Sequence, residues 1–389
     1  MGNQASKVIE KTKERRGNKT RRKSTATVGG GRSHSSLSIS HASSSNSHGN
    51  YDWVEPSSGS GAIDAAMAAA GMADVRKPAP PMMTAAGGDN DTTSTTTTTP
   101  TLTPRRKSVS EILARRKGSF SRISTSQEDF REYDRLQRQH YLLKSARKSN
   151  TVAPIKNPKI ILDLGSAGGI WALEMAATFP DTEVIGIDIQ PPPLQQNAPK
   201  NLKFIESNIY EKFPLADASV DLVFQRGMGH IIRKDKWPHV LEEILRVLKP
   251  GGYVELVEAD LWHHNPGPVQ QAFDAFMQEQ CSEYGLDFVF TESLSAMIET
   301  AGFTDVSHTS LDIPIGEWPK DPELKQYGFI NKETQKAYLR NRKQFYVSAW
   351  GIAPEDYDVA VQEVMDEFEE YHGFSRFNSW VARKPAAED

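Results

Sequence analysis

Beyond Pro154, short aliphatic runs alternate with helical stretches, and this alternation restricts the fold more than any other feature of the sequence. The runs KIILDLG, TEVIGIDI, NLKFIES, VDLVFQR and YVELVEA have the length and composition of strands. The segments IWALEMAATF, WPHVLEEILRVL and TESLSAMIETAG have helical spacing and lie between or after them. Repeated alternation of this kind predicts an α/β fold with a parallel sheet and helices on both faces.

Residues 1–125 differ from the rest of the chain in composition. They are rich in Ser, Thr, Gly, Pro and Asn, with runs such as TTSTTTTTPT, and they contain few large aliphatic side chains. Such a segment buries too little apolar surface to offset the entropy of ordering. We therefore expect a long disordered leader, with a small hidden domain as the alternative.

Residues 126–389 are expected to form one domain. The spacing of Phe130, Tyr133 and Leu136 fits a helix at its start. Near the C-terminus, IPIG fits a strand, a loop is expected after it, and DYDVAVQEVMDEFEEY fits an amphipathic helix. The expected parts are an N-terminal helix at 126–150, a core at 155–260, and a cover with the last strands at 261–389.

Charge and cysteine content exclude several classes of protein. Residues 1–150 carry 25 Lys and Arg against 13 Asp and Glu, whereas residues 151–389 carry 21 against 37. The acidic second part argues against nucleic acid as a partner, since phosphate binding needs clustered Lys and Arg. Cys281 is the single cysteine, so we expect no intrachain disulfide, no metal site and an intracellular protein. We find no signal peptide and no apolar run of transmembrane length.

The stretch ILDLGSAGGIW, residues 161–171, carries the strongest functional signal. A strand ending near Asp163 leads through a Gly-rich turn into a helix, and ligands of doubly wound sheets bind beyond the carboxyl ends of strands. Gly165 and Gly169 let the backbone approach a ligand and present N–H groups to it. The spacing does not match G-x-G-x-x-G, which disfavours a nicotinamide dehydrogenase. A tight connection without a ligand is the alternative.

Polar residues also follow the next two strands. Asp188 ends the second strand, where a carboxylate can accept hydrogen bonds from both hydroxyls of a ribose. Asn208 and Ile209 end the third strand and can flank a base. Each signal is weak alone, because Asp and Asn also form turns and helix caps. Their order, completed by the turn LKPGGY, favours a nucleoside site.

This set of features resembles the class I S-adenosylmethionine-dependent methyltransferases, and within them the fungal LaeA-type methyltransferases. The resemblance runs from EYDRLQRQH to VARKP, roughly two thirds of the chain, and does not cover the leader. It rests on APIKNPKIILDLGSAGGIWA, EVIGIDIQP, FQRGMGHI and LKPGGYVELVEAD, and the segments AGFTDV and IPIGEWPKDPELKQYG indicate the subfamily. It implies a Rossmann-like seven-stranded sheet whose antiparallel last strand lies in FNSWVARKP.

The resemblance also implies S-adenosylmethionine as the cofactor. Asp163 and the Gly-rich loop would face its methionine part, Asp188 would hold the ribose, and Asn208 would border the adenine. Two residues depart from the family pattern: Ala167 replaces a usual glycine, and Asn208 replaces a usual acid. The implied cofactor-binding residues are Asp163, Gly165, Ser166, Ala167, Gly169, Asp188, Ile189, Asn208, Ile209 and Arg226.

Methyl transfer requires no obligatory catalytic residue. The cofactor carries the reactive group, and the protein mainly aligns it with the acceptor. A base is needed only where the acceptor must lose a proton. The candidates are His230, Glu258 and Asp260, near the ends of the fourth and fifth strands; a structural histidine and turn-capping carboxylates are the alternatives.

The first residues, MGNQASK, match the N-myristoylation pattern at Gly2. One myristoyl chain binds membranes weakly, and residues 7–23 supply a second signal in nine Lys and Arg against two Glu. We therefore expect a cytoplasmic protein held at an anionic membrane surface. A nuclear-localisation-like or merely solvated basic tail, with a nuclear pool, is the alternative. Ser24, Ser108 and Ser119 follow basic residues, and their phosphorylation would weaken attraction to lipid.

Two functions remain open at this point. The first is a membrane-tethered S-adenosylmethionine-dependent methyltransferase (EC 2.1.1.-) acting on an unidentified small molecule or protein. The second is a regulatory adaptor that keeps the fold with little or no turnover. The sequence does not indicate the oligomeric state.

Overall fold

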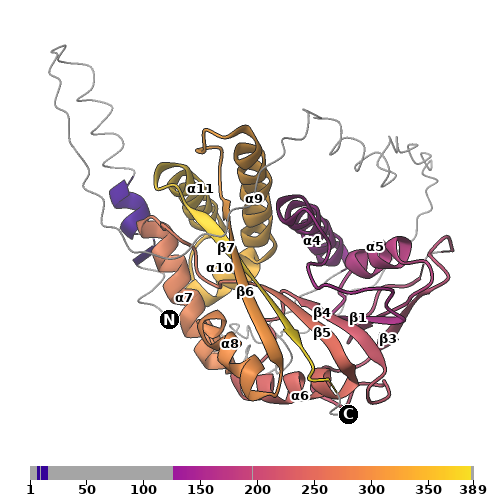
Figure 1. Ribbon diagram of the computed structural model, residues 1–389. Coiled ribbons are helices and arrows are strands. Elements are labelled where there is room, and N and C mark those ends of the chain that lie inside the picture. Colours follow the sequence, from indigo (N-terminus) through magenta and orange to yellow (C-terminus); the bar gives the residue numbers. More distant parts are fainter. Residues whose placement is uncertain (1–6, 9, 16–125, 195, 387–389) are drawn as a thin grey trace, which may run out of the picture. The chain divides into compact units, whose positions relative to one another are not determined.

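A seven-stranded mixed sheet organises the computed structural model, which describes residues 7–8, 10–15, 126–194 and 196–386. The strand order is β3-β2-β1-β4-β5-β7-β6. β1 to β5 run parallel, and β7 lies antiparallel between β5 and β6 (Figure 1), which confirms the predicted Rossmann-like sheet. The strands are β1 Ile160–Leu164, β2 Glu183–Asp188, β3 Leu202–Glu206, β4 Val220–Arg226, β5 Leu248–Ala259, β6 Thr304–Pro314 and β7 Phe374–Arg383.

Helices cover both faces of this sheet and extend beyond one end of it (Figure 1). The predicted helices near residues 126, 170, 237, 291 and 356 are all present. The helices are α4 Ser126–Arg147, α5 Ile170–Thr178, α6 Trp237–Val247, α7 Pro268–Tyr284, α8 Phe290–Thr300, α9 Pro322–Asn341, α10 Lys343–Trp350 and α11 Pro354–Glu370.

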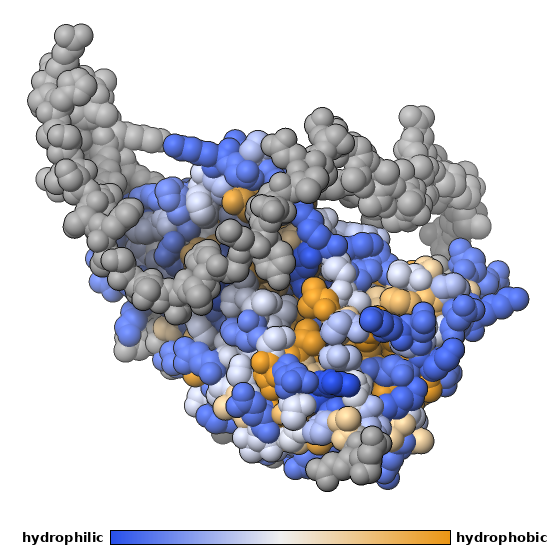
Figure 2. All heavy atoms as spheres, in the orientation of Figure 1, coloured by the Kyte–Doolittle hydropathy of each residue, from blue (hydrophilic) through white to orange (hydrophobic). Residues whose placement is uncertain are grey.

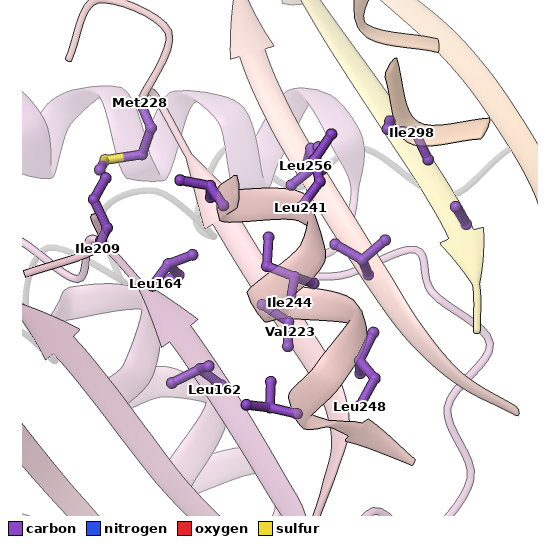
Figure 3. Close-up of a cluster of buried hydrophobic side chains, with 14 of the residues drawn as sticks. Leu162, Leu164, Ile209, Val223, Met228, Leu241, Ile244, Leu248, Leu256 and Ile298 are labelled. Carbon is purple, nitrogen blue, oxygen red and sulfur yellow. The ribbon is translucent and has the colours of Figure 1, made fainter. Parts of the chain in front are cut away.

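Alternate residues of β1 pack into different clusters, because successive side chains of a strand point to opposite faces. Ile161 belongs to the cluster formed with α5, where Trp171 stacks on Phe224 with the ring centroids 3.9 Å apart. Leu162 and Leu164 belong to the cluster formed with α6 and α8 (Figure 3). The central strands are therefore buried on both faces, and their carboxyl ends are fixed in position.

The segment after β6 differs from the prediction. We expected a loop, but the segment contains the helices α9 and α10. Asp321 caps α9 by accepting a hydrogen bond from the Leu324 amide at 2.8 Å, and Pro322 occupies the first turn. These are ordinary helix-start signals. The helix is rich in Lys, Glu and Gln, so its apolar stripe is too narrow to show in the hydrophobic pattern.

The helices α7, α10 and α11 share a second hydrophobic cluster with α9. Phe276, Tyr346 and Trp350 are largely buried there, with ring centroids 5.0–5.5 Å apart. These helices of residues 261–389 therefore pack against one another, and their role as a cover stays a prediction.

Residues 7–8 and 10–15, within the predicted leader, are helical. Val8 is buried in the cluster of α7, α10 and α11. Arg15 donates to Glu363 at 3.1 Å and to Glu370 at 2.7 Å, both on α11.

The remainder of the leader, including Gly2, Ser24, Ser108 and Ser119, lies outside the described residues. Among the helices of the described part, none is both long and apolar enough to cross a membrane.

Candidate functional site at the carboxyl ends of the strands

The Gly-rich loop between β1 and α5 turns sharply at the sheet edge. Gly165 and Ser166 both donate their amides to the Ile187 carbonyl of β2, at 2.8 and 3.0 Å. Gly165 and Gly169 adopt φ angles of +73° and +71°. A Cβ atom at Gly165 would lie 2.4 Å from the sulfur of Met228. The backbone conformation therefore favours glycine at this position, whereas the flexible end of the Met228 side chain can shift.

Ala167 adopts a φ angle of +46° in the same loop. This left-handed conformation is unfavourable for a residue with a Cβ atom. The amide of Ala167 donates to Oδ2 of Asp188 at 2.9 Å, which helps to hold the loop in this shape. The departure from glycine therefore adds local strain without preventing the loop from forming.

Asp188 ends β2 beside this loop. Its Oδ2 faces the Ala167 amide and its Oδ1 accepts from the Gln190 amide at 2.9 Å. Each carboxylate oxygen has further lone pairs, so both remain able to accept from a ligand hydroxyl. The predicted ribose-binding position thus lies next to the predicted methionine-binding loop.

Two buried polar atoms at the end of β1 lack protein partners among the described residues. Oδ2 of Asp163 and Oγ of Ser166 form no hydrogen bond, although their residues are only 4% and 8% exposed. Buried polar atoms are usually satisfied. The turn formed by Gly165 and Gly169, here called the glycine cradle, lies beside these atoms. Together they fit a ligand that carries hydrogen-bond donors, such as the ammonium end of S-adenosylmethionine.

Arg226, at the end of β4, belongs to a buried polar chain. Both Nη atoms lie 3.2 Å from Nδ1 of His140, and Nε2 of His140 lies 3.0 Å from Glu174. Because arginine can only donate, Nδ1 of His140 accepts and Nε2 carries the hydrogen that is donated to Glu174. Burial lowers the pKa of His140 and lowers that of Arg226 to about 10.

The sequence prediction did not include His140 or Glu174. His140 lies on α4 and Glu174 on α5, so only the fold brings them to the end of β4. The charge of Arg226 reaches Asp163 and Glu258, which lie on the neighbouring strands β1 and β5. This arginine therefore balances the carboxyl groups around the site.

The two residues expected near the adenine lie in different surroundings. Oδ1 of Asn208 accepts from the Tyr210 amide at 3.0 Å, as in the turn-forming alternative. Ile209 is 6% exposed and points toward Met228 (Figure 3).

Ile189, by contrast, is 43% exposed beside Asp188, and Leu194 nearby is 50% exposed. Apolar residues gather in the middle of one face of the molecule in Figure 2. Exposed apolar side chains beside a nucleoside position can contact a base.

Two of the three candidate bases are fully engaged by protein groups. Glu258 is 1% exposed and accepts from the amides of Met228 and Gly229 at 3.0 and 2.9 Å. Asp260 accepts from Thr291 at 2.7 Å and from Asn378 at 2.9 Å, and its other oxygen lies 2.8 Å from His264. These carboxylates hold the loop after β4 and the end of β5 in place, as the capping alternative requires.

His230 lies in the loop after β4. Burial lowers its pKa to about 4, and the positive charges of Arg342 and Arg135 act in the same direction. The ring is therefore neutral at physiological pH, and it can accept a hydrogen bond or line the acceptor site.

Among the described residues, no group of three or more His, Cys, Asp or Glu side chains is arranged to hold a metal ion.

The buried carboxyls predict a pH dependence of stability. Burial raises the pKa of Asp163 and of Glu258 to about 7 in the folded protein. The same groups ionise near pH 4 in the unfolded chain, so unfolding releases protons between these values. These two carboxyls therefore lower the free energy of unfolding as the pH rises from about 5 to about 8. The lowered pKa of His230 acts in the opposite direction below about pH 6.5, so the net fall should appear between about pH 6.5 and 8.

Urea unfolding at about pH 5, 6.5 and 8 measures this trend, and Asp163→Asn should flatten it. A free energy of unfolding that rises between about pH 6.5 and 8 would contradict the assignment.

Comparisons with known proteins agree with this geometry. A family model described as a methyltransferase domain matches residues 161–252, from β1 into β5. Methyltransferase pytC of Aspergillus terreus is 29% identical over 275 residues, covering 66% of this chain and 82% of that protein. Secondary metabolism regulator LAE1 of Cochliobolus heterostrophus is 29% identical over 214 residues, covering 51% of this chain and 67% of the regulator. N-methyltransferase gliN of Aspergillus fumigatus is 26% identical, covering 65% and 94%.

Among solved structures, Haemonchus contortus phosphoethanolamine N-methyltransferase 2 in complex with S-adenosyl-L-methionine is similar. Its sequence identity is 19% and its TM-score 0.38, covering 68% of this chain and 61% of that one. The fold assignment rests on the strand order of this chain and not on this distant match.

Residues 161–252 match a methyltransferase domain, and with this strand order the chain is similar to the class I S-adenosylmethionine-dependent methyltransferases. Within this class it is similar to the fungal LaeA-type methyltransferases. S-adenosylmethionine is the cofactor of this class.

Proposed function

We propose that this protein transfers a methyl group from S-adenosylmethionine to an acceptor bound beside the loop after β4. The single observation that carries the proposal is the pair of unpartnered buried atoms, Oδ2 of Asp163 and Oγ of Ser166, in a glycine cradle beside Asp188. The proposed cofactor-binding set also includes Arg226, Ile189, and Asn208 with Ile209 at the adenine edge.

The protein groups in this proposal bind and orient. When bound, S-adenosylmethionine supplies an electrophilic methyl group on a sulfonium. Asp163 and Ser166 would hold the amino-acid end, and Asp188 would accept from the ribose hydroxyls. Glu258 fixes the loop that carries His230 by accepting two backbone amides, so the neutral imidazole keeps a defined position near the acceptor. Holding the acceptor, the methyl group and the sulfur in line lowers the activation free energy by roughly 7–11 kcal/mol.

Transfer of label tests the proposal. The protein is incubated with S-adenosylmethionine labelled in its methyl group and with a fungal extract, and labelled products are counted. We expect label in a discrete product, and none with Gly165→Val, because a β-branched residue strongly disfavours the φ of +73° that this loop needs. Absence of label from the wild-type reaction, with cofactor bound, would reject turnover on the acceptors of that extract.

A regulatory adaptor with little or no turnover is the second candidate. It is favoured by the similarity to proteins named as secondary metabolism regulators and by the strained Ala167, which departs from the family's glycine. Cofactor binding without transfer in the label experiment would support it.

We further propose that the N-terminus tethers the protein to an anionic membrane. The support is the sequence pattern: Gly2 in a myristoylation motif, followed by nine Lys and Arg within residues 7–23. Arg15 is one of these nine, and its charge is engaged by Glu363 and Glu370. The other basic residues of the segment would supply the attraction to lipid. This proposal includes a cytoplasmic, peripheral location, with a nuclear pool of unacylated protein.

Gly2→Ala should move the protein from the membrane pellet to the soluble fraction, because the variant cannot accept the acyl chain. Fractionation of a eukaryotic host expressing either form measures the change, and intact mass reports acylation. Ser6→Gly changes the last residue of the same motif and leaves Gly2 intact. It shows whether the motif must be complete for Gly2 to be acylated. Equal partitioning of Gly2→Ala and wild type would contradict the tether.

A further inference from the structure

A cluster of charged side chains joins α4 to the junction of α9 and α10. Arg135 donates to Glu132 through Nε at 3.0 Å and through Nη2 at 2.8 Å. Asn341 donates to the other oxygen of Glu132 at 3.0 Å. The guanidinium of Arg342 lies over the ring of Tyr338, 3.7 Å from its centroid. Two arginines and one carboxylate therefore meet in a partly buried place.

The carboxylate of Glu132 is committed to Arg135. Burial opposes its ionisation, but the hydrogen bond and charge of Arg135 outweigh burial and bring the pKa of Glu132 to about 2. The nearest approach of Arg342 to it is 4.0 Å, which is an ion pair without a good hydrogen bond. Within the described chain, Arg342 forms no other ion pair and no side-chain hydrogen bond.

The charges of this cluster do not balance. Glu132 neutralises one arginine, and His230 is neutral, so one positive charge remains at Arg342. The side chain of Arg342 is 18% exposed. A guanidinium with free donors binds carboxylates well, because two parallel N–H groups match two oxygens.

The cluster lies near His230, in the loop after β4. Arg342, Arg135 and Glu132 are the charged groups that act on His230. His230 follows Met228, whose side chain contacts the Gly165 position in the cofactor loop. On α4, the residue after Glu132 is Tyr133, and its ring would lie 2.9 Å from a Cβ atom at Gly168. Two short segments, Met228–His230 and Glu132–Tyr133, therefore connect the surroundings of Arg342 with the cofactor loop of the proposed site.

We propose that Arg342, stacked on Tyr338 and flanked by Arg135, binds a carboxylate of the methyl acceptor. The proposal rests on the proposed transferase function and deepens it by naming a substrate class: an acceptor that bears a carboxylate. The ring of Tyr338 stacks against the guanidinium of Arg342. Glu132 accepts from Arg135 and Asn341, so Arg342 keeps donors that no side chain accepts. The acceptor is thereby anchored at one end, with its nucleophile near His230.

Binding of a small carboxylate tests this proposal without requiring turnover. Benzoate is the probe, and benzamide is its uncharged analogue of the same shape. Both are titrated by calorimetry or ligand-observed NMR into the full-length protein saturated with S-adenosylhomocysteine. We expect benzoate to bind at least about tenfold more tightly than benzamide, since one charge-assisted pair is worth that much.

Arg342→Gln should abolish the preference, and Arg342→Lys should retain part of it. The matched control is Arg340→Gln, which removes an exposed arginine from the end of α9 and should leave the preference unchanged. Equal binding of the two probes, no binding of benzoate, or an unchanged preference in Arg342→Gln would each overturn the proposal. Affinity for S-adenosylhomocysteine is measured first, and its absence in wild type would count against the proposed function instead.

Discussion

Asp188→Ala is expected to weaken the binding of S-adenosylhomocysteine by roughly 100-fold or more, because two charge-assisted hydrogen bonds to ribose are lost. The Oδ2 atom also accepts from Ala167, so its removal frees a loop that already holds a residue at a positive φ angle. Isothermal titration calorimetry of both proteins measures the difference.

Asp181→Ala is the matched control for this prediction. Asp181 is exposed and lies just before β2, at the opposite end of the strand that Asp188 ends. Its removal should leave affinity unchanged. Equal affinities of wild type and Asp188→Ala would reject the assignment of the ribose position.

Glu255→Ala is expected to lower the free energy of unfolding by about 3–5 kcal/mol, the usual cost of breaking a buried ion pair. Glu255 is fully buried in β5, where it pairs with Arg147 at the end of α4. Its other oxygen accepts from the amides of Val152 and Ala153 at 2.9 and 3.0 Å. The substitution leaves the Val152 amide and the nearly buried guanidinium of Arg147 without this partner.

Urea unfolding, or the thermal midpoint where unfolding is irreversible, measures this effect. Glu299→Ala removes an exposed carboxylate from the end of α8 and should change stability by less than about 0.5 kcal/mol. A small effect of Glu255→Ala would show that α4 is attached to the sheet by other contacts.

The core of the fold follows from the sequence because its signals are local. Buried strands such as Ile160–Leu164 appear as continuous aliphatic runs, and the turn after them is marked by glycines that its backbone requires. The amphipathic α11 and the antiparallel β7 were likewise expected. The helices α9 and α10 were missed, because α9 is rich in polar and charged residues and its clearest signal is the Asp321–Pro322 start.

Some residues of the site could be predicted from the sequence, and others are brought together only by the fold. Asp163, Asp188 and the Gly-rich loop meet because parallel strands end at one edge, which the sequence already implies. The chain from Arg226 through His140 to Glu174 depends on how α4 packs against α5, and no local pattern encodes that contact. Arg342 and Glu132 are separated by about two hundred residues in sequence, so only the fold brings them together.

A crystal structure of the protein with S-adenosylhomocysteine tests the central claim most directly. It should place the ribose hydroxyls against Asp188 and the amino-acid end near Oδ2 of Asp163 and Oγ of Ser166, atoms that otherwise have no partner in the described chain. A nucleoside bound elsewhere, or no bound nucleoside at saturating concentration, would contradict it.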